Sequence, residues 1–232
     1  MNEKTKALRA AFPVTIPVMT GYLFLGMGYG ILMNSIGYGP LWTLLMSLLI
    51  FAGSIQYVAI ALLTSAFNPL YTLLLTLMVN ARHLFYGISM LEGFKGAGRL
   101  KPYLVFGLTD ETFSLLSAVD PPEGIERKWF QFFITLLDHV YWVAGSVLGS
   151  IIGAVISFNS MGLDFVLTAL FVVIFIDQWK GTKNHIPALV GLGSALLCLL
   201  LFGQDHFMIP AMVLILFLLT VFRKRIREEE KP

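Results

Sequence analysis

The sequence predicts an all-α fold, a polytopic membrane helix bundle of about seven or eight transmembrane helices, some of them short or broken. Of its residues, 57% are hydrophobic and 13% are charged, and the mean hydropathy is +0.79. A soluble globular domain needs far less apolar surface. The apolar stretches are continuous rather than alternating, as in LWTLLMSLLI at 41–50. Continuous stretches favour helices over barrel strands, so we expect a single integral membrane domain over residues 1–232.

Eight apolar segments are candidate spans. The fourth and the last three have about 17–18 residues, which is marginal for ~30 Å of hydrocarbon, so some are expected to be half-helices or short spans. The first follows a basic N-terminus and contains Pro13 and Pro17 without a small-residue cleavage site, which predicts a retained span rather than a signal peptide. The segments cover residues 13–36, 41–66, 69–91, 102–119, 129–158, 162–179, 186–203 and 206–222.

The distribution of lysine and arginine predicts the orientation, because cytoplasmic loops are enriched in both. With eight crossings, twelve of the sixteen lysine and arginine residues lie on one side of the membrane. We read that side as cytoplasmic, which places the chain in the cell (inner) membrane with both termini in the cytoplasm. Lys95, Arg99 and Lys101 then lie on the opposite side, against the rule. If segment 102–119 does not cross, seven spans remain and the basic C-terminus lies outside. We favour eight spans, and the sequence leaves seven open.

Residues 40–56 can be aligned with residues 162–178, since both are apolar, end in glutamine and follow a glycine-rich segment. We interpret this as a weak internal repeat, with halves at 13–91 and 129–222 linked by 92–128. Many transporters consist of two such halves with the site between them. Chance likeness between apolar helices is the alternative, and the sequence does not decide between parallel and inverted halves.

Glycines recur at a spacing of four residues in two segments, namely Gly26 and Gly30 in the first and Gly145, Gly149 and Gly153 in the fifth. Small residues at this spacing let helices approach closely. The alternative is a hinging or sliding interface for alternating access, and both roles can hold together.

Arg82 lies in the middle of the third apolar segment, next to His83. A guanidinium at the bilayer centre costs about 2.5–3.5 kcal/mol on insertion scales, so it needs a partner or a function. Asn80 and His83 share one helix face, and Arg82 points toward Tyr86. The alternative, in which Arg82 snorkels to an interface, requires a long reach from this depth.

The other polar candidates are Asp110 and Glu111 in the fourth segment, Asp138 and His139 in the fifth, and Gln56 in the second. Asp138 opposite Arg82 would form a compensated pair, unless Asp138 lies under the headgroups. His139 is a candidate proton relay. Three acids face one arginine, so at least one carboxyl is expected to be protonated or to reach water, as proton coupling requires. An arginine with several acids can match both ends of a free amino acid.

Other function classes lack their signatures. The chain has no GxxxxGK[ST] loop, no HExxH and no GxSxG motif. We therefore expect a transporter rather than an enzyme, without metal or other cofactors. A channel or an accessory structural subunit remains an alternative, and an intramembrane hydrolase is a weaker one. The single Cys198 is expected to be a small apolar residue of the core or of the lipid-facing surface.

A set of motifs in a fixed order resembles the AzlC family, the large subunit of bacterial branched-chain amino acid exporters. They are AGSIQ at 52–56, NARH at 80–83, TDETF at 109–113, Asp138-His139, and GLDF at 162–165 with Asp177-Gln178. The resemblance covers about residues 10–222. It implies efflux of leucine, isoleucine and valine, with methionine as a further candidate, and resistance to azaleucine. It also implies a small AzlD-family membrane partner of about four spans and no ATPase subunit. Roles for individual residues rest on the polarity argument above.

Overall fold

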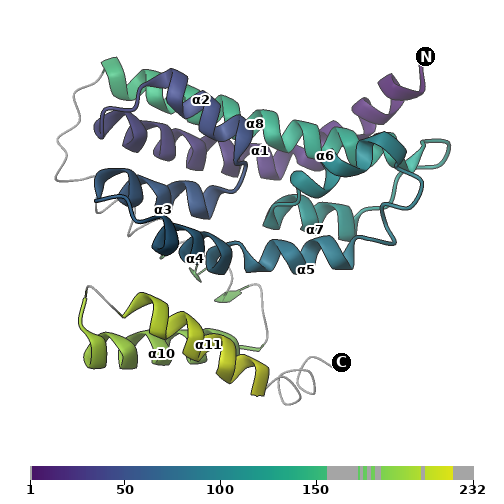
Figure 1. The fold of residues 1–232 in the computed structure, drawn as a ribbon. Coiled ribbons are helices and arrows are strands. Elements are labelled where there is room, and N and C mark those ends of the chain that lie inside the picture. Colours follow the sequence, from purple (N-terminus) through teal and green to yellow (C-terminus); the bar gives the residue numbers. More distant parts are fainter. Residues whose placement is uncertain are drawn as a thin grey trace. The chain divides into compact units, whose positions relative to one another are not determined.

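The computed structural model describes residues 2–155, 172, 175–176, 179–180, 184–204 and 207–221, and these residues form helices without a strand (Figure 1). The predicted all-α fold is confirmed. The chain forms two compact units, Met1–Leu163 and Asp164–Pro232. The helices of the first unit are α1 (Glu3–Ser35), α2 (Pro40–Leu49), α3 (Gly53–Thr64), α4 (Pro69–Val79), α5 (Ala81–Ser89), the 3-10 helix η1 (Gly98–Leu100), α6 (Lys101–Phe106), α7 (Asp110–Ala118) and α8 (Arg127–Val155).

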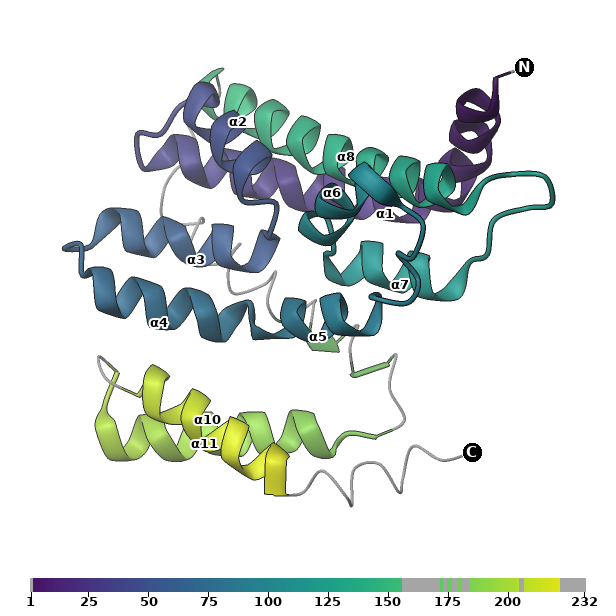
Figure 2. The ribbon, with the colours of Figure 1, turned by 45° about the vertical axis from the view of Figure 1, so that its right-hand side comes forward.

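Helices α1 and α8 pack against each other and form the centre of the first unit (Figures 1 and 2). In the described part of the chain, these two helices are individually long and apolar enough to cross a membrane. They run in parallel. Near their N-terminal ends Lys4 Nζ lies 4.4 Å from the Trp129 ring centroid, and further along Thr15 Oγ1 lies 3.2 Å from Tyr141 Oη. Pro13 and Pro17 lie inside α1 without ending it.

The contact between α1 and α8 is made at backbone distance. A Cβ on Gly30 would collide with Ser146 O, and a Cβ on Gly149 would collide with Met27 O. Only glycine fits at such positions, and the close approach lets the two helices pack along their length. All five glycines singled out in the sequence lie in this contact: Gly26, Gly30, Gly145, Gly149 and Gly153.

The segment predicted as a crossing over 41–66 is instead re-entrant. It leaves the C-terminal end of α1, where the Trp42 ring lies 6.3 Å from Tyr38. It reaches the middle of α1 at Phe51, whose ring lies 6.3 Å from Tyr22. Helix α3 then turns back, since Tyr57 Oη donates a hydrogen bond to Leu25 O. Hydropathy alone could not reveal this reversal, because both halves are apolar. The turn depends on Phe51, which has a φ of +38°.

Helices α4 and α5 follow one another across the unit and together cover the predicted segment 69–91 (Figure 1). The helix is interrupted at Asn80, which serves as both the C-cap of α4 and the N-cap of α5. The far end is fixed by Met90, whose Sδ lies 3.8 Å from Ser117 Oγ. The interruption places the first turn of α5 in the middle of the unit.

The segment predicted over 102–119 is the second re-entrant segment. It starts at the N-terminal end of α8 and reaches the middle of that helix, where the Phe106 and His139 ring centroids lie 5.8 Å apart. Helix α7 then returns, and Leu116 packs in one cluster with Phe130. The reversal lies at Gly107, where a Cβ would collide with the Thr135 side chain. This segment therefore turns back instead of crossing. The sequence leaves that possibility open because the segment is short.

The first reversal changes the end of the unit at which the basic loop lies. Gln131 Nε2, near the start of α8, donates a hydrogen bond to Gly93 O at 3.2 Å. The loop with Lys95, Arg99 and Lys101 thus lies at the same end as the basic N-terminus and Arg127. The eight-crossing prediction placed it at the opposite end, because that count made segment 41–66 a full crossing. With the re-entrant path the basic loops of the described first unit all lie at one end, as the positive-inside rule expects.

The order of elements in the first unit is that of an inverted repeat. A re-entrant segment (α2 and α3) precedes a crossing (α4 and α5), and a second re-entrant segment (α6 and α7) entering from the other end precedes α8. The tips carry the similar sequences FAGSIQ at 51–56 and FGLTDE at 106–111, and the Phe51 and Phe106 ring centroids lie 6.3 Å apart. The repeat predicted from residues 162–178 lies almost entirely outside the described residues.

The second unit contains α10 (Ile186–Phe202) and α11 (Met208–Val221), which pack against each other. They cover most of the predicted segments 186–203 and 206–222. Gly203, with a φ of +72°, ends α10 and starts the connection. Most of segment 162–179 lies outside the described residues.

Gly30→Ala should destabilise the protein, because the added methyl group meets the backbone of Ser146. Overpacking of this kind typically costs about 1–3 kcal/mol, so the unfolding midpoint in detergent should fall by about 3–8 °C. Gly21→Ala is the matched control on the same helix, since a Cβ there meets nothing within 4 Å. Equal midpoints for the two variants would contradict the close contact.

Cysteine labelling should separate the two paths of the chain. In a Cys198→Ser background, Lys95→Cys and Asp120→Cys should react with a membrane-impermeant maleimide from one side of the membrane. Ser35→Cys and Phe67→Cys should react from the other side. The eight-crossing path instead places positions 95 and 120 on opposite sides, and that labelling result would exclude the re-entrant segments.

Candidate functional site

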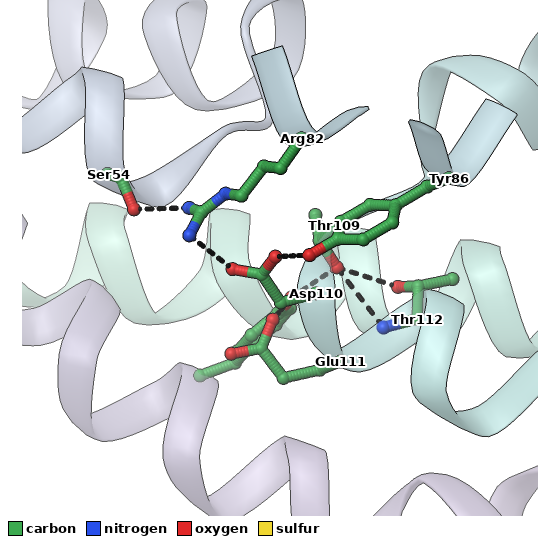
Figure 3. Close-up of polar contacts among 8 residues, drawn as sticks. Ser54, Arg82, Tyr86, Thr109, Asp110, Glu111 and Thr112 are labelled. Carbon is green, nitrogen blue, oxygen red and sulfur yellow. Dashed lines mark hydrogen bonds and ion pairs between the residues drawn. The ribbon is translucent and has the colours of Figure 1, made fainter. Parts of the chain in front are cut away.

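Three half-helices begin at one place in the middle of the first unit (Figure 3). Arg82, in the first turn of α5, places Nη1 3.1 Å from Oδ2 of Asp110, the first residue of α7. Arg82 Nη2 donates a hydrogen bond to Ser54 Oγ, in the first turn of α3, at 2.6 Å. Tyr86 Oη donates to the other oxygen of Asp110. We call Ser54, Arg82, Tyr86 and Asp110 the half-helix junction.

The junction has a distinctive electrostatic environment, because helix N-termini carry partial positive charge and free backbone N–H groups. On α7 the carboxylate of Asp110 lies at this favourable end, and the N-cap Thr109 accepts a hydrogen bond from Thr112 N at 3.2 Å. On α3 and α5 the N-cap residues, Ala52 and Asn80, make no capping bond with their side chains. In α5 the backbone takes up part of this end, because His83 N donates a hydrogen bond to Asn80 O at 2.9 Å.

The ion pair at the junction corrects one sequence-based expectation. Arg82 pairs with Asp110 rather than with Asp138, because the reversal at Gly107 brings the start of α7 to the start of α5. The Arg82 and Asp110 side chains are 33% and 35% exposed. Arg82 thus has an acidic partner inside the unit and is not isolated at a surface. Asn80 Oδ1 and Arg82 Nε are buried without a hydrogen-bond partner among the described residues.

Asp138 lies in the middle of α8 and is fully buried. Its Oδ2 accepts a hydrogen bond from Thr112 Oγ1 at 2.9 Å, and its Oδ1 has no partner in the described part of the chain. Glu111 points to α1 instead, where its Oε2 lies 2.7 Å from Tyr22 Oη. The adjacent acids of α7 therefore have different hydrogen-bond partners, and neither Glu111 nor Asp138 forms the ion pair with Arg82.

Two of the predicted polar residues hold the first re-entrant tip in place. Gln56 Oε1 accepts hydrogen bonds from Trp142 Nε1 at 2.9 Å and from Ala52 N at 3.3 Å. His139 Nε2 lies 3.2 Å from Ser47 O. A carbonyl only accepts, so Nε2 carries the hydrogen.

The other imidazole nitrogen of His139 lies 3.1 Å from Tyr103 Oη, and the ring stacks on Phe51 at a centroid distance of 4.3 Å. These contacts tie both re-entrant segments to α8. His83 lies beside the junction, with its ring 5.8 Å from that of Tyr86 and nearly perpendicular to it. Among the described residues no three His, Cys, Asp or Glu side chains gather as metal ligands.

Comparison with known proteins decides the family. The family model described as AzlC protein matches residues 17–156, which include every residue of the half-helix junction. The chain belongs to the AzlC family. It is 52% identical to the branched-chain amino acid transport protein AzlC of Bacillus subtilis, over 99% of this chain and 92% of that protein.

Other relatives of the chain are more distant. An uncharacterized membrane protein of Helicobacter pylori (strain ATCC 700392 / 26695) is 45% identical over 97% of this chain and 99% of its own length. The inner membrane protein YgaZ of Escherichia coli is 26% identical over 86% of this chain and 82% of its own length. No solved structure matches the chain. Membership of the AzlC family identifies the chain as a membrane protein.

Several residues of the site in this AzlC-family chain escaped the sequence argument. Ser54 and Tyr86 complete the junction, and Tyr22 and Thr112 bind the two buried acids. The spacing of four residues between Arg82 and Tyr86 is a usable signal, because it places both side chains on one helix face. Ser54, Tyr22 and Thr112 carry no such signal, since their roles depend on how the re-entrant segments fold.

Removing Arg82 should leave the Asp110 carboxylate uncompensated. Arg82→Ala should lower the unfolding midpoint by about 3–6 °C, and adding Asp110→Asn should restore much of the loss, because the unpaired charge is then gone. Lys95→Ala is the control, since its ion pair with Glu92 is exposed and contributes little. Additive effects of Arg82→Ala and Asp110→Asn would show that the two side chains do not interact.

Proposed function

We propose that the protein is a secondary transporter that exports branched-chain amino acids, namely leucine, isoleucine and valine, with methionine as a further candidate. The observation that carries the proposal is the Arg82–Asp110 ion pair at the meeting point of three half-helix N-termini. Transporters commonly bind the anionic group of a substrate at such interrupted helices. The name of the Bacillus subtilis relative supports the substrate class.

In this proposal the amino acid replaces the internal ion pair with two external ones. The substrate carboxylate binds the planar guanidinium of Arg82 and the N-terminal end of α3, whose N-cap side chain makes no capping bond. The substrate ammonium binds Asp110, whose other oxygen is held by Tyr86. Without substrate, Arg82 and Asp110 neutralise each other, so neither charge stays uncompensated in the low-dielectric interior.

Export is coupled to the proton gradient in this proposal, and Glu111 and Asp138 are the proton-binding groups. Burying an ionised carboxylate without a cation is costly, and Asp138 has only a hydroxyl as partner. The glycine contact between α1 and α8 provides a smooth surface on which the two helices move against each other, so that the site opens to one side of the membrane at a time. The chain lies in the cell (inner) membrane as one integral domain, with its N-terminus and C-terminus cytoplasmic, and works with a small AzlD-like membrane subunit.

Efflux measurement tests the proposal. Cells without the gene, loaded with a leucine-containing dipeptide, should accumulate leucine, and the wild-type gene should restore export. Arg82→Ala should abolish that rescue. Arg82→Lys should restore it only in part, because an ammonium lacks the planar fork of a guanidinium.

Lys95→Ala serves as the expression-matched control and should export leucine normally. Unchanged leucine levels after deletion would refute the substrate assignment. Full export by Arg82→Ala, at normal expression, would remove the junction from the transport mechanism.

A further inference from the structure

A continuous line of side-chain oxygens connects Glu111 and Asp138, the two acids that the ion pair leaves out. Tyr22 Oη lies 2.7 Å from Glu111 Oε2 and 2.6 Å from Thr109 Oγ1. Thr109 Oγ1 lies 3.0 Å from Thr112 Oγ1, which lies 2.9 Å from Asp138 Oδ2. All four separations are ordinary O–H···O hydrogen-bond lengths. The five residues come from α1, α8 and the second re-entrant segment, and we call them the hydroxyl chain.

Counting hydrogens shows that the hydroxyl chain needs one extra proton. It contains four oxygen–oxygen contacts but only three hydroxyl hydrogens, one each on Tyr22, Thr109 and Thr112. With both carboxyls ionised, Tyr22 donates to Glu111 and Thr112 donates to Asp138. Thr109 then has one hydrogen for two neighbours, and one close contact has none. A single proton on either carboxyl supplies the missing hydrogen.

We propose that the hydroxyl chain holds one proton and passes it between Glu111 and Asp138. When Glu111 carries the proton, Glu111 donates to Tyr22, Tyr22 to Thr109, Thr109 to Thr112 and Thr112 to the Asp138 carboxylate. In the transfer each oxygen passes its hydrogen to the next, so one O–H bond breaks at Glu111 and one forms at Asp138. The net change is the movement of one proton, and no other reactant is needed.

Burial assigns the two ends different roles. Asp138 and Thr112 are fully buried, Tyr22 is 4% exposed and Thr109 6% exposed, whereas Glu111 is half-buried. Glu111 is therefore the end that exchanges protons, and Asp138 is the end that stores one.

Charge at the half-helix junction acts on the exchanging end. Arg82 and Asp110 lie next to Glu111, and Tyr86 binds Asp110. At the other end of the chain, His139 is next to Asp138 in the sequence, but both of its ring nitrogens already have partners, Ser47 O and Tyr103 Oη. Substrate that separates Arg82 from Asp110 changes the field at Glu111, and so changes which end holds the proton.

This inference rests on the proposed transport of leucine, and the test separates the two. Inverted membrane vesicles from the complemented deletion strain allow two measurements for each variant. The first is leucine uptake driven by a pH gradient. The second is exchange of external for internal leucine at equal pH, which needs no net proton movement. Wild-type vesicles without leucine exchange would refute the proposed function and, with it, the inference that rests on it, whereas wild-type exchange with unaltered coupling in the variants below would refute the inference alone.

Tyr22→Phe and Thr112→Val each remove one hydroxyl from the chain. Gradient-driven uptake should fall at least about tenfold, as for loss of a proton-transfer group, while exchange stays within about twofold of wild type. Thr112→Ser keeps the hydroxyl and should keep both activities. Tyr141→Phe is the matched control. It also removes a buried tyrosine hydroxyl between α1 and α8, but that hydroxyl contacts Thr15 and lies outside the hydroxyl chain.

Three results would overturn the inference. The first is gradient-driven uptake in Tyr22→Phe equal to that in Tyr141→Phe. The second is loss of coupling in Thr112→Ser as complete as in Thr112→Val. The third is loss of exchange together with coupling in both hydroxyl-deleting variants, which would mean that the chain holds the fold rather than moves a proton.

Discussion

The ion pair between Arg82 and Asp110 is the interaction on which the centre of the molecule depends. A guanidinium and a carboxylate are each costly in a membrane interior, and together they cancel. They meet because three helices are interrupted, and each interruption leaves backbone groups without partners inside the helix. The fold gathers these interruptions in the middle of the first unit, where the Arg82 and Asp110 side chains are half-buried. Charge compensation and helix interruption therefore support each other.

The fold class and the polar inventory of the site could be predicted from the sequence, whereas the pairing could not. Composition predicts the helices, and the depth of Arg82 in its segment predicts that it has a partner. The partner is Asp110 because α6 and α7 form a reversal, and hydropathy does not distinguish a reversal from a crossing. Only the other reversal, in segment 41–66, left a local sign: Lys95, Arg99 and Lys101 violate the positive-inside rule unless that segment returns to its starting side.

The inverted order of the elements explains why the polar groups gather where they do. Each re-entrant segment ends its first half and begins its second half in the middle of the unit, so both tips deliver helix N-termini to the same place. The tips are not equivalent chemically. FAGSIQ contributes Ser54 to the junction and Gln56 to the support of the tip, whereas FGLTDE contributes Asp110 to the junction and Glu111 to the hydroxyl chain. In the proposed function, one architecture thus serves substrate charge and proton binding with different residues.

The parallel contact of α1 and α8 constrains how the protein can assemble. Thr15 and Tyr141 touch across 126 positions of the chain, and all the other helices of the first unit lie between α1 and α8 in the sequence. During synthesis α1 enters the membrane long before its partner exists. The intervening half-helices cannot find their final places until α8 arrives, because their tips pack on it. Assembly of this unit is consequently a late, concerted event after insertion, and a chain truncated before α8 should remain a substrate for membrane quality control.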